Sequence, residues 1–241
     1  MVLSVALVLG LARVALAWSP RRLDGFRRRL FRKAAAALLR ILGVHVQVSG
    51  PRPEPPFLLV TNHLGYVDIL VVAAVVESVF LSKAEVRSWP LLGWITGQFG
   101  TIYLDRADRR DIPRALAAVE RALAERRGVT FFPEGTSSRG AEVEPFRSPL
   151  LALPARAGLA VHAAALSYRT RPGDPPAHLA VCWWGDMELA PHLLALLRLR
   201  RVEATLTFCD EPIRETDRKL LAERLRAAVA GRFLPVVSGA A

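Results

Sequence analysis

Short runs of β-branched and aromatic residues alternate along most of the chain with longer segments of helical periodicity. The runs that are typical of buried strands are VHVQV at 44–48, FLLVT at 57–61, GTIYL at 100–104 and VTFF at 129–132. A stiff proline-rich connector, PRPEPP, separates the first two runs. The alternation predicts an α/β fold, a single domain in which helices flank a largely parallel, twisted sheet.

The segment between the third and fourth runs predicts one βαβ unit. Asp111 can cap a helix that has Pro113 in its first turn. The apolar residues that would share one face of this helix are Ile112, Leu116, Val119 and Leu123. We expect Gly128 to end the helix before VTFF begins. Strands joined in this way are expected to run parallel, with a right-handed crossover.

Polar residues directly follow three of the predicted strands. They are Asn62 and His63 after FLLVT, Asp105 and Arg106 after GTIYL, and residues 133–136 after VTFF. Open parallel sheets bind ligands beyond the carboxyl ends of their strands. Three polar clusters at one edge of the sheet therefore predict a functional site at that edge.

The first 18 residues are apolar except for Ser4 and Arg13. These two would lie on opposite faces of a helix, so the polar stripe of an in-plane amphipathic helix is missing. Residues 15–17, ALA, resemble a signal-peptidase site, but the leading end of the chain lacks the basic n-region of a signal peptide and arginines follow at once. We therefore expect an uncleaved membrane anchor, and an interfacial segment or a cleaved signal remain as alternatives.

The net charge of +11 is concentrated just after this apolar stretch. Residues 19–40 contain eight basic residues and one acidic residue, so they carry an excess of seven positive charges. Next to an apolar segment, such a block favours anionic lipid headgroups over nucleic acid as its partner. We expect residues 1–41 to anchor the chain and residues 42–241 to form the α/β domain on the cytoplasmic face of the cell inner membrane.

His63 and Asp68 lie five positions apart in TNHLGYVDIL, a run that otherwise reads as buried chain. Burying either group without a partner would cost several kcal/mol. If Asp68 lies about one turn into a helix after the strand, its carboxylate can accept a hydrogen bond from one imidazole N–H and leave the other nitrogen as a base. Because HxxxxD is a weak pattern, a helix-capping Asn62 or His63 with a solvated Asp68 remains the alternative.

The chain carries none of the common motifs for covalent or metal-dependent catalysis, such as G-x-S-x-G, H-E-x-x-H or a Walker loop. Its two cysteines, Cys182 and Cys209, do not have the spacing of metal ligands, so we expect no metal site. The hydroxyls near the predicted site are those of Thr136, Ser137 and Ser138. A histidine base could instead deprotonate a substrate hydroxyl, which would then attack an activated acyl group.

Two further features suggest anion binding at the same edge. FFPEGTSSRG at 131–140 offers Glu134 and backbone N–H groups on a glycine-containing turn, although an ordinary surface turn is the alternative. A single arginine such as Arg106 is by default a solvated charge. Its position at the end of a strand, beside two other polar clusters, favours phosphate binding.

In this order and at these separations, NHLGYVDIL, GTIYLDR and FFPEGTSSRG resemble the successive motifs of the glycerolipid acyltransferases, which acylate lysophosphatidic acid and related lysophospholipids. The resemblance extends from about residue 57 to residue 168. It implies transfer of an acyl group from a thioester, acyl-CoA or acyl-carrier protein, to the free hydroxyl of a lysophospholipid without any cofactor.

The resemblance also implies a role for each matching residue. His63 would be the general base on the acceptor hydroxyl, and Asp68 would hold its ring. Arg106 would contact the phosphate of the acceptor, and Lys83 would lie near the headgroup, with a simply exposed lysine as the alternative for Lys83. The expected substrate-binding residues of the third motif are Glu134, Gly135 and Thr136.

Two positions depart from the family pattern. Ser137 stands where the family commonly has an arginine, and the arginine of this chain follows at Arg139, so both are possible headgroup contacts. In AVHAAALSY, His162 stands where proline is common, and we interpret it as structural or as lining the pocket.

The expected acceptor is 1-acyl-glycerol-3-phosphate, which would give phosphatidic acid. Ser137 raises a different lysolipid, such as a lyso-aminolipid, as the alternative. An alternative of another class is a non-catalytic membrane lipid-binding protein that uses only the apolar segment and the basic block. The expected partners are the two substrates, an anionic membrane surface and, where the donor is acyl-carrier protein, that protein; nucleic acid is not expected.

Overall fold

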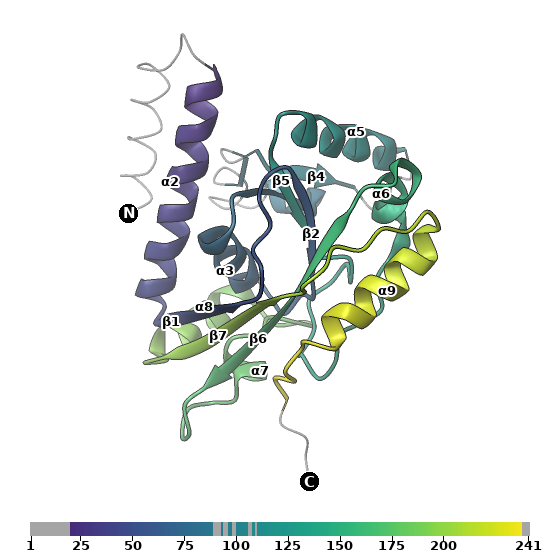
Figure 1. Cartoon of the computed structure of the whole chain (residues 1–241). Helices are drawn as coiled ribbons and strands as arrows, with labels where there is room; N and C mark the ends of the chain where they lie inside the picture. Colours follow the sequence, from purple (N-terminus) through teal and green to yellow (C-terminus); the bar gives the residue numbers. More distant parts are fainter. Residues whose placement is uncertain are drawn as a thin grey trace.

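The computed structural model describes residues 20–88, 93, 96–97, 100–105, 108 and 110–237 (Figure 1). The predicted apolar anchor at residues 1–18 and the predicted phosphate contact Arg106 lie outside the described residues. None of the helices in the described part of the chain has both the length and the apolar character that crossing a bilayer requires.

A seven-stranded sheet with the order β1-β7-β6-β2-β5-β3-β4 runs through the described part of the chain. Its strands are β1 Val44–Ser49, β2 Phe57–Thr61, β3 Ser78–Lys83, β4 Ile102–Leu104, β5 Gly128–Phe131, β6 Val161–Thr170 and β7 Val202–Phe208. Every neighbouring pair is parallel except β6 and β7, so β1 and β7 run opposite to the other five strands. The predicted α/β fold with a largely parallel sheet is confirmed.

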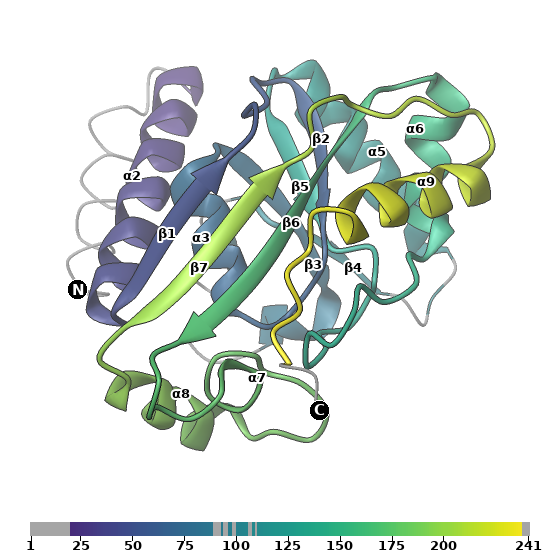
Figure 2. The ribbon, with the colours of Figure 1, turned by 60° about the horizontal axis from the view of Figure 1, so that its bottom comes forward.

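Helices cover both faces of the sheet (Figures 1 and 2). The helices are α2 Pro20–Ile41, α3 Val67–Val75, α5 Asp111–Ala124, α6 Ala152–Ala157, α7 Ala177–Ala180, α8 Leu189–Arg198 and α9 Arg218–Ala230, with 3-10 turns at η1 Ala84–Ser88 and η2 Ser148–Leu151. Buried residues of α2, α3, α7 and α8 share one core cluster, and those of α5, α6 and α9 share the other.

Strand β2 shows why this sequence needs helices on both sides. All five of its residues are buried. Leu59 joins the core cluster beneath α3, whereas Leu58 and Val60 join the cluster beneath α5 and α9. Side chains alternate between the faces of a strand, so an uninterrupted apolar run requires a covered sheet.

The predicted βαβ unit is present, but its helix begins and ends differently from the prediction. Both β4 and β5 pair in parallel with β3, which lies between them, so the expected parallel direction is confirmed. Asp111 does not cap α5: it is the first helical residue, and its carboxylate accepts hydrogen bonds from the Asp105 N–H and the Arg114 guanidinium.

The predicted end of this helix was also wrong. Helix α5 ends at Ala124, and Arg126 takes the positive φ of 57° that reverses the chain. Gly128 is instead the first residue of β5. A Cβ at Gly128 would lie 2.2 Å from the Phe57 ring on the neighbouring strand, so glycine is required there for close strand packing.

Candidate active site

Two of the three predicted polar clusters meet at the carboxyl edge of the sheet. β2 and β5 are neighbours, so His63 and Glu134, which follow them, lie side by side. The His63 N–H donates a hydrogen bond to Glu134 Oε2 at 3.2 Å. Asp105 follows β4, which lies three strands away from β2, a separation of about 14 Å at the usual strand spacing. This third cluster therefore lies at the same edge but away from His63.

Asn62 fixes the chain where it leaves β2. Its side-chain amide donates to the Leu166 carbonyl at 2.9 Å, and its carbonyl oxygen accepts from the Leu166 N–H at 2.8 Å. The buried side chain thus continues the pairing of β2 with β6 by one more step. Asn62 is therefore not a helix cap, which was one of the alternatives that the sequence left open.

The hydrogen bond that the sequence predicts between His63 and Asp68 is present, with His63 Nδ1 2.7 Å from Asp68 Oδ2. Asp68 lies in the first turn of α3 and has no exposed surface. The same carboxylate accepts from the N–H groups of Leu64 at 2.6 Å and Gly65 at 3.0 Å, and from the Tyr168 hydroxyl at 2.7 Å. Four donors around one carboxylate offset the cost of burying it.

Tyr168 is the partner of Asp68 that sequence reasoning missed. It lies on β6, 100 residues away from Asp68 along the chain. Burial, reinforced by the nearby Asp68 charge, raises the pKa of Tyr168 well above its usual value, so its hydroxyl remains a donor. The only signal in the sequence is a tyrosine that follows the apolar run AAAL in a predicted strand, because a buried phenol needs a hydrogen-bond partner.

The surroundings of the His63 ring determine its tautomer. Because Asp68 Oδ2 accepts at Nδ1, that nitrogen carries the proton and Nε2 keeps its lone pair. The ring stacks on Phe132, with 4.2 Å between ring centroids and an interplanar angle of 18°. The His63 side chain keeps 21% of its surface exposed, so a substrate can reach it. Such an arrangement can act chemically as an oriented general base.

Glu134 is buried with one unsatisfied oxygen. The side chain is 3% exposed, and Oε1 has no hydrogen-bond partner among the described residues. Burial raises the pKa of Glu134 to about 8, and the negative charge of Asp68 adds a smaller increase. The hydrogen bond from the His63 N–H acts in the opposite direction and lowers the pKa. At neutral pH this carboxyl group is therefore mostly protonated beside the His63 backbone.

The rest of the third motif connects the site to a second loop. Gly135 has a φ of 82°, and Thr136 after it is exposed. Ser137 donates a hydrogen bond from its hydroxyl to the Trp183 carbonyl at 2.5 Å, and the Ser138 N–H donates to the His63 carbonyl at 3.0 Å. Arg139 is exposed. Ser137 thus holds the loop before α8 against the His63 segment.

Lys83 ends β3, so it lies at the same edge of the sheet between Glu134 and Asp105. Its side chain is 53% exposed and forms an ion pair with Glu85. His162 is the second residue of β6, so it lies away from the strand ends that carry His63 and Glu134. It is opposite Leu59 in the pairing of β6 with β2 and packs edge-on against Phe57.

The two cysteines are not reactive nucleophiles. Cys182 is fully buried, and burial raises its pKa far above the usual value. Cys209 is partly buried, and burial raises its pKa as well. Within the described residues, no group of histidine, cysteine, aspartate and glutamate side chains is arranged to hold a metal ion.

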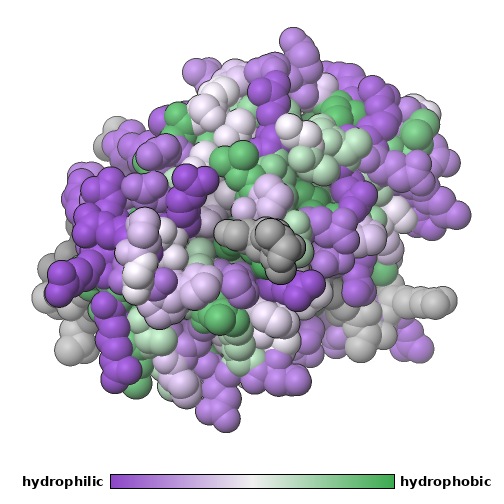
Figure 3. All heavy atoms as spheres, turned by 90° about the horizontal axis from the view of Figure 1, so that it is seen from below, coloured by the Kyte–Doolittle hydropathy of each residue, from purple (hydrophilic) through white to green (hydrophobic). Residues whose placement is uncertain are grey.

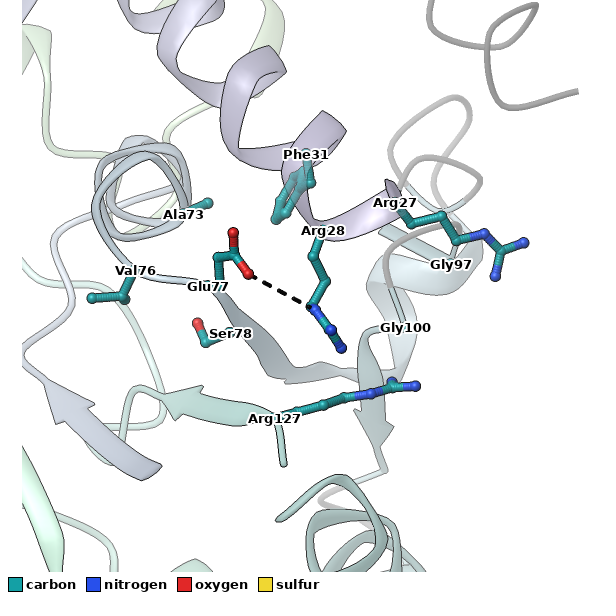
Figure 4. Close-up of a pocket in the computed structure, with 10 residues that line it drawn as sticks. All are labelled: Arg27, Arg28, Phe31, Ala73, Val76, Glu77, Ser78, Gly97, Gly100 and Arg127. Carbon is teal, nitrogen blue, oxygen red and sulfur yellow. Dashed lines mark ion pairs between the residues drawn. The ribbon is translucent and has the colours of Figure 1, made fainter. Parts of the chain in front are cut away.

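A cavity of about 120 Å³ lies at the opposite edge of the sheet (Figure 4). Its lining includes Ser78, which begins β3, and Arg127, which precedes β5, so it lies at the amino ends of the strands. Arg28 and Glu77 point toward one another across it, with Arg28 Nε 4.0 Å from Glu77 Oε2. This ion pair holds α2 against the sheet, and the cavity is remote from His63.

The chain is similar to known acyltransferases. A sequence model of a family described as Acyltransferase matches residues 43–167. The chain is 39% identical over 235 residues to the lyso-ornithine lipid O-acyltransferase of Pseudomonas aeruginosa, covering 93% of this chain and 87% of that protein. It is 31% identical over 212 residues to the 1-acyl-sn-glycerol-3-phosphate acyltransferase of Neisseria meningitidis, covering 85% and 82%.

The fold is also similar to a solved structure. The crystal structure of the 1-acyl-sn-glycerophosphate acyltransferase PlsC from Thermotoga maritima matches with a TM-score of 0.62, covering 95% of this chain and 96% of that one. The two sequences are 18% identical, so this similarity shows the shared α/β fold alone.

Proposed function

The chain belongs to the Acyltransferase family and is an O-acyltransferase of the lysophospholipid type, and from this premise we propose that His63 is its general base, acting on the free hydroxyl of a lysolipid. The observation that carries the proposal is the 2.7 Å hydrogen bond from His63 Nδ1 to the buried, fully hydrogen-bonded Asp68. Asp68 acts as the positioning residue that keeps Nε2 free to accept a proton.

The proposed reaction needs no covalent enzyme intermediate. His63 Nε2 takes the proton of the acceptor hydroxyl while the oxygen attacks the carbonyl carbon of an acyl thioester. The carbon–sulfur bond then breaks, and the imidazolium returns its proton to the departing thiolate. The products are an ester and a free thiol, the latter carried by coenzyme A or by acyl carrier protein. No cofactor enters this scheme.

For the acceptor, we propose a lyso-aminolipid of the lyso-ornithine type. The P. aeruginosa relative, whose name states that activity, is similar over nearly the whole chain. Ser137 supports this choice: it stands where an arginine is common in the family, and its hydroxyl is bound to the Trp183 carbonyl, so this position offers no positive charge to a phosphate.

The second candidate acceptor is 1-acyl-glycerol-3-phosphate. The similarity to the N. meningitidis enzyme supports it. So does the exposed Lys83, which lies at the same edge as His63 and could contact a phosphate together with Arg106, Thr136 and Arg139.

We also propose that the protein works at a membrane, because its acceptor is a lipid. Residues 1–41 would anchor it through the apolar stretch and the basic helix α2, and residues 42–241 would carry the reaction on the cytoplasmic face of the inner membrane. The C-terminal half of α2 packs on the α/β body through the buried Ala35 and Leu39. The proposed anchor and the body are therefore in direct contact.

The histidine assignment is tested with His63→Ala. We expect acyl transfer by the purified enzyme to fall by about 10² to 10⁴. The matched control is His45→Ala, which alters an exposed histidine on β1 and should leave the rate unchanged. If His63→Ala keeps the far-ultraviolet circular dichroism of the wild type and also its full rate, His63 is not the base.

The acceptor is tested by competition. A mixture of lyso-ornithine lipid and 1-acyl-glycerol-3-phosphate is supplied with an acyl thioester, and the products are identified by mass spectrometry. We expect acylated ornithine lipid to dominate. If phosphatidic acid dominates instead, the second candidate is the substrate.

A further inference from the structure

Helix α8 is apolar on both of its faces, which is unusual for a helix at a protein surface. Residues 189–197 contain no charged residue. His192 and Leu196 face the protein and are buried. The outward side presents Leu193, Leu194 and Leu197 with 37%, 59% and 48% of their surfaces exposed.

Two neighbouring segments enlarge this apolar surface. Leu179 on α7 is 51% exposed, and Ile41 at the end of α2 is 61% exposed. Ile41 lies close to the end of α8, because the Gly43 carbonyl accepts from the Val202 N–H and Gly43 is in contact with the Arg200 backbone. We name the exposed residues Ile41, Leu179, Leu193, Leu194 and Leu197 the leucine surface.

The leucine surface lies at the same edge of the sheet as His63. Helices α7 and α8 follow β6, which runs parallel to β2, so they extend from the edge where β2 ends (Figure 2). Figure 3 views this end of the molecule and shows apolar side chains interrupting a mostly polar surface.

Hydrogen bonds attach α8 to the His63 segment from within. Burial lowers the pKa of His192, so its ring is neutral: Nε2 donates to the Cys182 carbonyl at 3.0 Å and Nδ1 accepts from the Tyr66 hydroxyl at 2.9 Å. The neighbouring Trp183 N–H donates to the Leu64 carbonyl at 2.8 Å. Tyr66 and Leu64 both lie between His63 and Asp68, so the position of α8 is fixed relative to the base.

Charge identifies the occupant of this surface. Arg198 and Arg200 follow the apolar part of α8, and Arg40 precedes Ile41, and all three are exposed. An apolar face bordered by arginines matches the acyl region and the anionic phosphates of a bilayer surface. A second copy of this chain would bring the same arginines together across a two-fold axis, which is unfavourable.

We propose that the leucine surface inserts into the interfacial region of an anionic lipid bilayer and sets the depth of the His63 site above it. The inference rests on the proposed function, because its use is to let a lysolipid keep its acyl chain in the bilayer while its hydroxyl reaches His63. It adds a second membrane contact, made mainly by α7 and α8 of the α/β body, to the anchor proposed for residues 1–41.

A fluorescent label tests the contact without relying on activity. Leu194→Cys and, as a control, Leu220→Cys are each made in a Cys209→Ser background and labelled with bimane; Cys182 is buried and does not react. Leu220 is 44% exposed and lies in the first turn of α9, at the opposite edge of the sheet. On vesicles of phosphatidylethanolamine and phosphatidylglycerol, we expect only the Leu194→Cys label to shift to the blue and to be quenched by spin-labelled lipid.

Two label results would overturn the proposal. One is equal behaviour of the two labels on vesicles. The other is a blue shift of the Leu194→Cys label that depends on protein concentration in the absence of lipid, which would instead indicate an interface between two copies.

A rate measurement tests the purpose of the surface. For Leu194→Gln/Leu197→Gln, we expect acylation of a lysolipid embedded in vesicles to fall about tenfold, since two partly exposed leucines lose their insertion free energy. Acylation of a short-chain, water-soluble lysolipid should be unchanged, and Leu220→Gln should change neither rate. An equal loss on both substrates would contradict the proposal. If the wild type acylates neither, the proposed function fails, and the label experiment still decides the surface.

Discussion

Asp68 and Glu134 are two buried carboxyl groups that both accept hydrogen bonds from His63, Asp68 from its ring and Glu134 from its backbone N–H. Their hydrogen-bonding environments differ. Asp68 accepts four hydrogen bonds, from the His63 ring, two backbone N–H groups and the Tyr168 hydroxyl. Glu134 accepts the His63 N–H at Oε2, and its Oε1 has no partner in the described part of the chain. The first arrangement suits a charge that orients a base, and the second suits a neutral acid.

The protonation of Glu134 gives the chain a pH-dependent stability. Its pKa is about 8 in the folded state and 4.5 when exposed, so the folded state binds the extra proton between these values. The contribution of Glu134 is therefore fully present below pH 4.5 and is lost as the pH rises toward 8. Compared with Glu134→Gln, the wild type should lose unfolding free energy with a slope approaching about 1.4 kcal/mol per pH unit near neutral pH.

Urea unfolding at a series of pH values measures this difference. Glu188→Gln, an exposed glutamate before α8, is the control and should follow the wild type at every pH. Parallel curves for the wild type and Glu134→Gln would mean that Glu134 is ionised in the folded protein.

At the scale of elements, the site depends on how the end of β2 is held. Asn62 bonds to both backbone groups of Leu166 on β6, and the next four residues form the turn into α3 that carries His63. Gly65 in this turn lies close to a neighbouring segment, because a Cβ there would be 2.8 Å from the Trp183 nitrogen. The turn is thus fixed from two sides, by β6 and by the loop before α8.

Asn62→Ala should destabilise the fold strongly. The change leaves the N–H and the carbonyl of the buried Leu166 without the two hydrogen bonds that they now make. We expect a loss of about 2 to 5 kcal/mol in the free energy of unfolding, measured by urea titration.

Ser49→Ala provides a matched control, since it removes one exposed cross-strand hydrogen bond, from Ser49 Oγ to Thr207 Oγ1. We expect it to cost less than about 0.5 kcal/mol. Similar losses for the two variants would show that water replaces the Asn62 contacts.

The sequence could predict the elements and the edge at which the polar residues gather, because apolar periodicity and the ends of strands are local features. It could not predict the contacts that complete the site. Tyr168 meets Asp68 across 100 residues, and Phe132 meets His63 only because β2 and β5 pair. The role of Gly128 was missed for the same reason, since only the neighbouring strand explains why no side chain fits there.

At the scale of the whole molecule, a basic stripe leads toward the leucine surface. Arg29, Lys33 and Arg40 are exposed on α2, and their spacing of four and eleven residues places them within about 40° of one another around the helix axis. Helix α2 runs along the side of the sheet and ends at Ile41, beside α8 (Figure 1). One bilayer surface could therefore contact both the stripe and the leucine surface.

This geometry predicts how vesicle binding depends on salt. Reversing two charges of the stripe, in Arg29→Glu/Lys33→Glu, should weaken binding to vesicles rich in phosphatidylglycerol by about 10- to 100-fold at low salt. The difference from the wild type should shrink at high salt, because exposed charges interact over about one Debye length, roughly 8 Å at physiological ionic strength. Binding is measured by co-sedimentation of the full chain with vesicles.

The control pair is Arg121→Glu/Arg218→Glu, which makes the same change in net charge on α5 and α9, away from α2. If binding follows net charge alone, the two pairs should weaken it equally, and the orientation argued from α2 and α8 would be wrong. If binding depends on which face meets the lipid, only the α2 pair should weaken it strongly. Because the stripe acts through charge and the leucine surface through apolar burial, high salt should suppress the first contribution and leave the second.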